Sequence, residues 1–498
     1  MKATRLFGII VLGLGLILVL LTWLHIAQAA SIAADRFVTV TGSGSACTQA
    51  APCALQTALS LAANGDTIYV AGGVYTGTGA AVITLTGSIT LYGGWSGNPD
   101  GSIRRDPAVY PTTLDGEGAR RVVYINGNIT PTLDGFIVTR GNATGLPVSN
   151  GRGGGVFVND AHPLILNNTI TNNVAAASPG TQGYGGGLYL VNAGQAIVRY
   201  NLVISNAAST AYWGSGGGIY LTGSSSGLQL QFNQVLSNTA TTTGTVGWGG
   251  GIYGGPDGAL IQGNVVAGNR TNSTGTGSGA GLFQYGGTAH YLGNLAYGNI
   301  GYTAVWLQYS RARFEGNRVV DNATLEGICL TSGSGDGPTL LNNLVARSGS
   351  RAFSAYGSAS KILTATLLHN TLVGAGSGYG VYGEYAALSL TNTLVASVTW
   401  GITNTTPAGA TVSADHTLFW VVTNPGISGA NPLSGDPRFV DPAGGDYHLG
   451  PGSAAIDAGV DAGVTTDIDG ELRLNVPDIG ADEWYFRVYL PLVLRDYR

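Results

Sequence analysis

The sequence Gly185-Gly186-Gly187-Leu188-Tyr189, followed by Asn201, is one copy of a pattern that recurs through the middle of the chain. Each copy has a glycine-rich run, an aliphatic residue, an aromatic ring and, at a similar distance, an asparagine. A repeat of this length cannot bury its own apolar face, so it must stack on copies of itself. The pattern therefore predicts a solenoid. The other glycine-rich runs begin at Gly153, Gly216, Gly249 and Gly279.

The asparagines mark the length of each coil. Three short strands with their turns need roughly 22 residues. The spacing is 22 to 27 residues in the second half of the repeats but 30 to 33 in the first half. We therefore expect extra loops before the early glycine runs, at 174–184, 207–215, 239–248 and 270–278, along one edge of the solenoid. The markers are Asn168, Asn201, Asn233, Asn264, Asn294, Asn317, Asn343, Asn370 and Asn392.

Apolar residues alternate with other residues within each coil, as in strands that bury one face. This predicts an all-β, single-stranded parallel β-helix of about 10–13 coils, with the marker asparagines hydrogen-bonded from coil to coil. One inward column is Val156, Leu188, Ile219, Ile252, Leu282, Val305, Ile328, Phe353, Val381 and Ile402. The other lies two residues after each marker: Ile170, Val203, Val235, Val266, Ala296, Val319, Val345, Leu372 and Leu394.

The first 30 residues have the pattern of an export signal. Lys2 and Arg5 precede an uncharged apolar run at 6–24, and Ala27-Gln28-Ala29 offers small residues for cleavage. Left uncut, the run is long enough to anchor the chain in a membrane. We expect cleavage, and a secreted or cell-surface protein that meets a membrane only if this segment is retained.

Residues 31–64 are predicted to cap the N-terminal end of the solenoid. Apolar residues at helical spacing over 54–63 indicate an amphipathic helix that would cover the open end of the core. Cys47 and Cys53 either form a disulfide, which an exported protein permits, or stay free thiols. Cys329 has no evident partner and is interpreted as a small strand residue.

The net charge of −5, with only two lysines, argues against nucleic-acid binding, which needs a basic face. Eleven of the 27 acidic residues lie between Asp436 and Glu483. Calcium is the only cofactor that this acidic segment suggests, because it prefers several oxygen ligands. Turn chemistry is the alternative, since aspartate before glycine or proline stabilises tight turns. The candidate ligands are Asp467, Asp469, Asp478, Asp482 and Glu483.

An aromatic residue directly follows each of six residues of the inward aliphatic column. Because side chains alternate between the two faces of a strand, we expect these rings to point outward. One interpretation is a sugar-binding strip, because pyranose rings lie flat on aromatic side chains and a polysaccharide could follow the row. The other is a structural stack covered by the long loops, which bring rings of their own. The column of rings is Phe157, Tyr189, Tyr220, Tyr253, Phe283 and Trp306, and the loop rings include Tyr184, Tyr212, Trp213 and Trp248.

Several segments carry a family resemblance. Leu91-Tyr-Gly-Gly-Trp95, Arg105-Asp-Pro107 and Leu133-Asp-Gly-Phe136 resemble secreted bacterial right-handed parallel β-helix proteins. The glycine-triplet repeats are similar to polymorphic outer-membrane-protein repeats. Asp436-Pro-Arg-Phe-Val-Asp-Pro442 and Asp478-Ile-Gly-Ala-Asp-Glu483 resemble choice-of-anchor Q regions. The resemblance implies a right-handed helix of pectin lyase-like fold. The expected parts of the chain are the parallel β-helix at 65–420, an irregular acidic C-terminal cap at 421–486, and an apolar and basic tail at 487–498.

The resemblance covers adhesins, matrix proteins and polysaccharide-active enzymes alike, so it does not fix an activity. Polygalacturonase-like hydrolases on this fold carry paired aspartates and a Gly-His-Gly motif, and the sequence has neither. Pectate-lyase-like enzymes use aspartate-held calcium and a basic residue. The only dense outward cluster of charge is interpreted either as an ion-pair patch or as an acid/base site. It comprises Arg311, Arg313, Glu315, Arg318, Asp321 and, one coil later, Glu326.

We therefore expect a non-catalytic protein that binds or organises extracellular polysaccharide, or another component of the cell envelope, through the aromatic column. Two alternatives stay open. One is a polysaccharide lyase or glycoside hydrolase, and the other is a purely structural envelope protein without a ligand.

Overall fold

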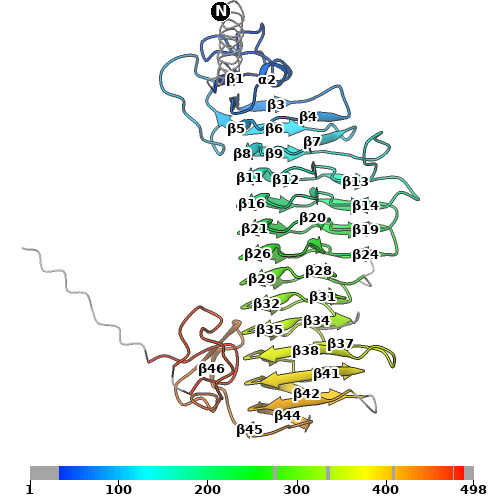
Figure 1. Cartoon of the computed structure of the whole chain (residues 1–498), viewed down its shortest axis with the longest axis vertical. Helices are drawn as coiled ribbons and strands as arrows, with labels where there is room; N and C mark the ends of the chain where they lie inside the picture. The colour runs from blue at the N-terminus through cyan, green and yellow to red at the C-terminus, as the bar shows by residue number, and fades with distance from the viewer. Residues whose placement is uncertain (1–32, 273–276, 332–336, 406–409, 475, 487–498) are drawn as a thin grey trace, which may run out of the picture.

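The computed structural model describes residues 33–272, 277–331, 337–405, 410–474 and 476–486. Short parallel strands stack into an elongated solenoid, with a small C-terminal region folded against its side (Figure 1). The predicted export signal and the tail at 487–498 lie outside the described residues. Among the residues described, no helix has the length and apolar character needed to cross a membrane. The fold is the predicted parallel β-helix.

Each coil contributes one strand to each of three ladders, and nearly all ladder pairings are parallel and in register. Ladder 1 has 14 strands and precedes the marker asparagines. Its strands are β1 (Asp35–Val38), β2 (Thr67–Ala71), β5 (Thr90–Trp95), β8 (Thr132–Asp134), β11 (Leu164–Leu166), β16 (Ile197–Arg199), β21 (Gln229–Gln231), β26 (Leu260–Gln262), β29 (His290–Leu292), β32 (Arg313–Glu315), β35 (Thr339–Leu341), β38 (Leu363–Leu368), β41 (Ala386–Thr391) and β43 (Val412–Asp415).

Ladder 2 follows the marker asparagines and ladder 3 follows the glycine runs; the long strand β42 belongs to both. Ladder 2 contains β3 (Gly73–Tyr75), β6 (Thr112–Asp115), β9 (Phe136–Thr139), β12 (Thr169–Thr171), β17 (Leu202–Ile204), β22 (Gln234–Leu236), β27 (Val265–Ala267), β30 (Leu295–Tyr297), β33 (Arg318–Val320), β36 (Leu344–Ala346), β39 (Thr371–Val373), β42 (Leu394–Asn404), β44 (Leu418–Gly426) and β45 (Leu433–Ser434). Ladder 3 contains β4 (Ala81–Leu85), β7 (Arg121–Asn126), β10 (Val156–Asn159), β15 (Leu188–Val191), β20 (Ile219–Thr222), β25 (Ile252–Gly254), β28 (Leu282–Tyr285), β31 (Thr303–Gln308), β34 (Glu326–Thr331), β37 (Arg351–Tyr356) and β40 (Tyr379–Glu384).

The core is a continuous file of aliphatic side chains along the solenoid axis. All ten residues of the inward column from Val156 to Ile402 pair with one another in register and are buried. The second inward column is confirmed from Ile170 to Leu372. Each coil therefore buries its apolar residues against the coils above and below, as a solenoid requires.

The marker asparagines form the predicted ladder from Asn168 to Asn370. Asn201 illustrates the geometry, since its Nδ2 donates to Asn233 Oδ1 at 3.0 Å and to Ile165 O at 2.8 Å. Its own backbone N–H donates to the same Asn233 oxygen at 3.0 Å. These side chains are buried, so the ladder satisfies backbone groups that the sharp turn would otherwise leave without partners.

The prediction was wrong at Asn392. Leu394 pairs with Thr371, and Val395 pairs with Leu372, so the strand is shifted by one residue from the expected register. Thr393 takes the ladder position, while Asn392 adopts a left-handed backbone conformation with φ of 51°. Its side chain bonds the C-terminal region, with Nδ2 donating to Val460 O at 2.6 Å.

A second asparagine ladder follows ladder 2, and sequence analysis missed it. Asn206 Nδ2 donates to Asn238 Oδ1 at 3.0 Å and to Ile170 O at 2.8 Å, which repeats the geometry of the first ladder. The signal was present, because each member lies five residues after a marker asparagine. The members are Asn173, Asn206, Asn238, Asn269, Asn299 and Asn322, and the file ends at Ser348.

The predicted edge loops contain regular structure. Two three-stranded parallel sheets stack beside the helix, because loops of similar length and composition repeat in three successive coils. They project along one edge of the solenoid (Figure 1). One sheet contains β13 (Val174–Ala176), β18 (Ala207–Ser209) and β23 (Thr239–Thr241), and the other β14 (Gly183–Tyr184), β19 (Gly214–Ser215) and β24 (Gly247–Trp248).

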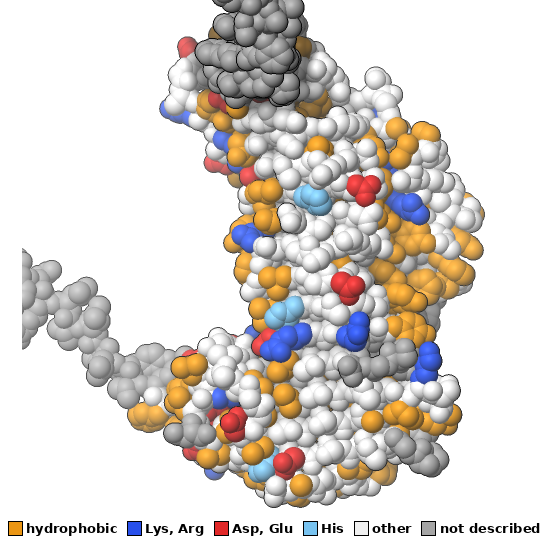
Figure 2. All heavy atoms as spheres, viewed as in Figure 1, with side chains coloured by type: hydrophobic (Ala, Val, Ile, Leu, Met, Phe, Trp, Pro, Cys, Tyr) orange, Lys and Arg blue, Asp and Glu red, His pale blue; other side chains and the backbone are white. Residues whose placement is uncertain are grey.

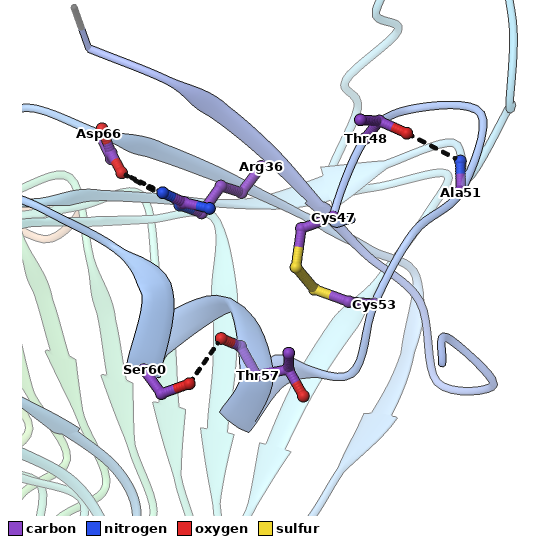
Figure 3. Close-up of a disulfide and its surroundings, with 8 residues drawn as sticks. All are labelled: Arg36, Cys47, Thr48, Ala51, Cys53, Thr57, Ser60 and Asp66. Atoms are coloured by element: carbon purple, nitrogen blue, oxygen red, sulfur yellow. Dashed lines mark hydrogen bonds and ion pairs between the residues drawn. A yellow bond between two sulfur atoms is a disulfide. The ribbon is translucent and has the colours of Figure 1, made fainter. Parts of the chain in front are cut away.

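The N-terminal cap matches the expectation of an amphipathic helix. Helix α2 (Leu55–Leu61) buries Leu55 and Ala58 against the first coils. Figure 3 shows Cys47 and Cys53 joined by a disulfide next to this helix, with their Cα atoms 4.6 Å apart. The described cysteine left over, Cys329, is free and buried in β34. The disulfide closes a short loop before α2, and both cysteines are buried in the core.

The C-terminal region differs from the expected cap. Stacked strands continue past residue 420 to β45, and the chain then folds back onto the outer face of ladder 2 along the last coils (Figure 1). It contains a short antiparallel pair, β46 (Phe439–Asp441) and β47 (Asp446–Leu449). A second apolar core explains this lateral position, because outward residues of the last coils, including Leu344, Val373 and Leu394, pack against Tyr447, Leu449 and Ile479.

Candidate functional site

The outward rings form a continuous stack on ladder 3. Strand register places them directly above one another, and Tyr124 of the preceding coil extends the file. Tyr220 lies 4.6 Å from Tyr253 and 5° from parallel, measured between ring centroids and planes. Tyr253 lies 4.7 Å from Phe283, again nearly parallel. We call Phe157, Tyr189, Tyr220, Tyr253, Phe283 and Trp306 the aromatic column.

The aromatic column is not an open row, as a sugar-binding strip would require. Phe157, Tyr189 and Phe283 are buried, while the other three rings are only half-buried. Burial raises the pKa of the Tyr253 hydroxyl to about 12 and moves that of Tyr220 in the same direction. Alternation correctly gave the direction of these rings but not their exposure, because the rings stack on one another and side chains such as Arg121 and Tyr184 cover them.

Arg121 covers the first end of the aromatic column. Its guanidinium carbon lies 4.8 Å from the centroid of Phe157, and its Nε donates to Gly153 O at 2.9 Å. Burial lowers the pKa of Arg121 to about 10. Further along, Tyr184 from the edge strand β14 meets Tyr220 edge-on at 5.2 Å. Both contacts add to the stability of a stack that is largely structural.

The edge loops carry rings that remain accessible. Tyr212 and Trp213 are parallel at 5.4 Å, and Trp213 meets Trp248 nearly at right angles at 6.3 Å. Trp213 is 38% exposed, and Tyr212 and Trp248 are half-buried. Figure 2 shows hydrophobic side chains gathered along the edge that carries β14, β19 and β24. We call Tyr184, Tyr212, Trp213 and Trp248 the loop-edge aromatic patch.

A buried charged cluster follows the aromatic column in the next coils. Glu326 is fully buried, and its Oε1 accepts hydrogen bonds from Arg351 Nη1 at 3.0 Å and from the Tyr356 hydroxyl. Among the residues that the structure describes, its Oε2 and Arg351 Nε have no hydrogen-bond partner. The Arg351 guanidinium also lies 4.3 Å from the ring centroid of Tyr382, which continues the same outward file. Sequence analysis missed Arg351 and Tyr356 because they join Glu326 only through stacking of separate coils.

The predicted charge cluster does not form one site. Arg313 Nε donates to Glu315 Oε2 at 2.7 Å, and His290 Nε2 contacts the same oxygen at 2.9 Å on ladder 1. Asp321 instead pairs with Arg347 at a turn, and Arg311 is exposed. Glu326 lies on ladder 3 and Arg318 pairs with Asp469. Residues close in sequence are separated here because strands and turns direct them to different faces.

Most of the predicted calcium ligands are occupied by backbone N–H groups. Asp467 Oδ1 accepts from the N–H groups of Asp469 and Glu471, and Asp478 accepts from those of Asp457 and Trp484. Glu483 accepts from two backbone N–H groups and pairs with Arg473. These three acids therefore stabilise turns. Asp469 and Asp482 are the two predicted ligands that approach each other, together with His448.

Comparison with known proteins agrees with this architecture. Residues 123–266 match the family model described as "Right handed beta helix region". The protein is accordingly an all-β, right-handed parallel β-helix. No curated protein matches the sequence.

Two solved structures show limited similarity. A pectate lyase, Pel9A, is 13% identical, with a TM-score of 0.36, over 91% of this chain and 97% of its own. An alginate lyase from Paenibacillus sp. str. FPU-7 is 13% identical, with a TM-score of 0.32, over 67% of this chain and 93% of its own.

Proposed function

We propose that this protein is a secreted or cell-surface rod that binds extracellular polysaccharide through the loop-edge aromatic patch. The observation that carries the proposal is the group of accessible rings on adjoining edge loops, with Trp213 the most exposed. Pyranose rings present apolar C–H faces that pack on such side chains. The N-terminal sequence pattern and the likeness of the C-terminal region to choice-of-anchor Q regions support a place outside the cell.

The buried rings of the aromatic column have a different role in this proposal. Phe157, Tyr189 and Phe283 hold the edge loops in place, and the patch above them makes contact with the ligand. This division combines the two interpretations of the rings, since one set is structural and the other is free to bind. A wholly structural envelope protein would have no need to expose Trp213 and Trp248 together.

Replacing Trp213 and Trp248 with alanine should abolish retention on the polysaccharide that the wild-type protein binds. We expect a loss of at least about tenfold in affinity, because two rings are removed from one surface. The measurement is a pull-down on a panel of insoluble polysaccharides, followed by an isotherm on the retained polymer. The matched control is Tyr200→Ala with Phe232→Ala, which removes another exposed stacked pair, at the turns between ladders 1 and 2.

The proposal would be contradicted if none of the polysaccharides in the panel retains the wild-type protein. An equal loss of retention in the two double variants would also contradict it. That result would show that exposed rings in general, and not the loop-edge aromatic patch, determine binding.

A lyase or hydrolase is the second candidate, and the Glu326 cluster favours it. A buried carboxylate with one unpartnered oxygen, beside an arginine and a tyrosine hydroxyl, has the groups needed for proton transfer to a sugar. The cluster also lies on the same outward face as the aromatic column.

If this second candidate is right, Glu326→Gln will abolish the release of new reducing ends or unsaturated products from the retained polymer. Glu315→Gln on ladder 1 is the matched control and should leave the rate unchanged. Product release that persists in Glu326→Gln, or that is absent from the wild-type protein, would exclude this role for the cluster.

A further inference from the structure

Three side chains of the C-terminal region converge on one point. One ligand atom each from His448, Asp469 and Asp482 lies within 4.8 Å of the others. The three come from separate stretches of chain: β47, the turn that contains Asp469, and the segment before Trp484. A nitrogen and two carboxylate oxygens, with room for water, are the donor set of many zinc sites. We propose that these residues bind one divalent transition-metal ion of the zinc type.

Asp482 provides evidence beyond the convergence itself. It is only 7% exposed, and its Oδ2 accepts a hydrogen bond from the Leu449 N–H at 2.6 Å. Within the described part of the chain, no hydrogen bond to its Oδ1 is found. A cation beside Oδ1 would offset the cost of burying this carboxylate.

His448 is held in the orientation that a metal ligand needs. Its Nδ1 lies 2.5 Å from Asp446 Oδ1, and its Nε2 lies 2.7 Å from Asp469 Oδ2. A carboxylate on the far nitrogen of a histidine fixes the ring and makes the other nitrogen a better donor. A metal ion would therefore take the place of the Nε2 proton.

Asp469 can bind the ion without losing its contact with the helix. Its Oδ2 faces His448, while its Oδ1 accepts from Arg318 Nη2 of β33 at 2.5 Å. Arg318 therefore places a positive charge beside Asp469 and leaves Oδ2 on the side of His448. The ion would thus link three segments of the C-terminal region at the point where one of them is already paired with the solenoid.

The donor set favours a transition metal over the calcium suggested by the sequence. Calcium takes six to eight oxygen ligands, whereas imidazole nitrogen suits zinc and its neighbours. The other acids of the segment, Asp467, Asp478 and Glu483, already accept backbone N–H groups. His448 and Asp482 also line an open cavity of about 350 Å³, through which an ion and its water ligands can enter.

The test is calorimetric titration of Zn²⁺ into the metal-stripped full chain, with Ca²⁺ as the comparison. We expect one Zn²⁺ per chain, bound at least about tenfold more tightly than Ca²⁺, and at least about a tenfold loss of zinc affinity in Asp482→Asn and His448→Gln. The matched control is His416→Gln, because His416 pairs with Asp415 at 2.9 Å outside this cluster. The control should bind Zn²⁺ as the wild-type protein does.

Proton release gives a second readout that needs no variant. Both ring nitrogens of His448 contact carboxylate oxygens, so each carries a hydrogen, and zinc binding at Nε2 should release about one proton, measured from the heat in buffers of different ionisation enthalpy. Absence of saturable binding at one ion per chain would overturn the proposal. So would binding without proton release, or binding that is equally tight in folded Asp482→Asn.

Discussion

Replacing Asn233 with alanine is expected to lower the free energy of unfolding by about 3 to 5 kcal/mol, because each buried polar group left without a partner costs about 1 to 3 kcal/mol. Asn233 Oδ1 accepts from both the backbone N–H and Nδ2 of Asn201. Its Nδ2 donates to Asn264 Oδ1 at 3.0 Å and to Val198 O at 2.9 Å. The variant leaves all four partners buried without this side chain. Equilibrium urea unfolding measures the change.

The matched control is Asn64→Ala. Asn64 Oδ1 accepts a hydrogen bond from the Ser88 N–H at 2.8 Å, but the contact is exposed. We expect this control to change the free energy of unfolding by less than about 0.5 kcal/mol. Similar losses for the two variants would show that the ladder does not contribute through buried hydrogen bonds.

Replacing Gly217 with alanine should be at least as damaging. A Cβ atom at this position would lie 2.4 Å from the carbonyl carbon and oxygen of Thr239 and 2.5 Å from the carbonyl oxygen of Gly250. These are backbone atoms of the next coil, so no side-chain rotation relieves the clash. We expect a loss of more than about 3 kcal/mol in the free energy of unfolding, or failure to fold, because overpacking at rigid backbone is costly.

Gly194→Ala serves as the comparison for Gly217→Ala in the same unfolding experiment. The nearest atom to a Cβ at Gly194 is 3.4 Å away, which is an ordinary contact. This variant should unfold at nearly the same urea concentration as the wild-type protein. If Gly217→Ala unfolds at the same urea concentration as the wild-type protein, the backbones of neighbouring coils must be farther apart at Gly217 than the structure shows.

The sequence was sufficient to predict the coils because the same residues repeat in each one. The inward column from Val156 to Ile402 and the ladder from Asn168 to Asn370 follow directly from period and spacing. Asn392 was misassigned because an asparagine occurs one residue early, and only the pairing of Leu394 with Thr371 reveals the shift. Local sequence patterns do not determine register where two neighbouring positions both suit the marker.

The candidate site was predicted only in part, because exposure depends on what covers a face. Alternation shows that Tyr189 points away from the core, but it does not show that its ring is covered by Phe157, Tyr220 and Arg152. For the same reason, the contact of Glu326 with Arg351 and that of Arg318 with Asp469 could not be found from spacing. These pairs depend on stacking between coils and on the docking of a distant segment.

We propose that the loop-edge aromatic patch is the polysaccharide-binding surface. The most direct measurement is a crystal structure of the protein with an oligosaccharide cut from the polymer that it retains. We expect a sugar ring packed flat on Trp213 or Trp248, with the buried rings of the aromatic column in the same positions as without the ligand. An oligosaccharide bound on ladder 1, or one that displaces the edge strands to reach Tyr189, would contradict this assignment of the binding surface.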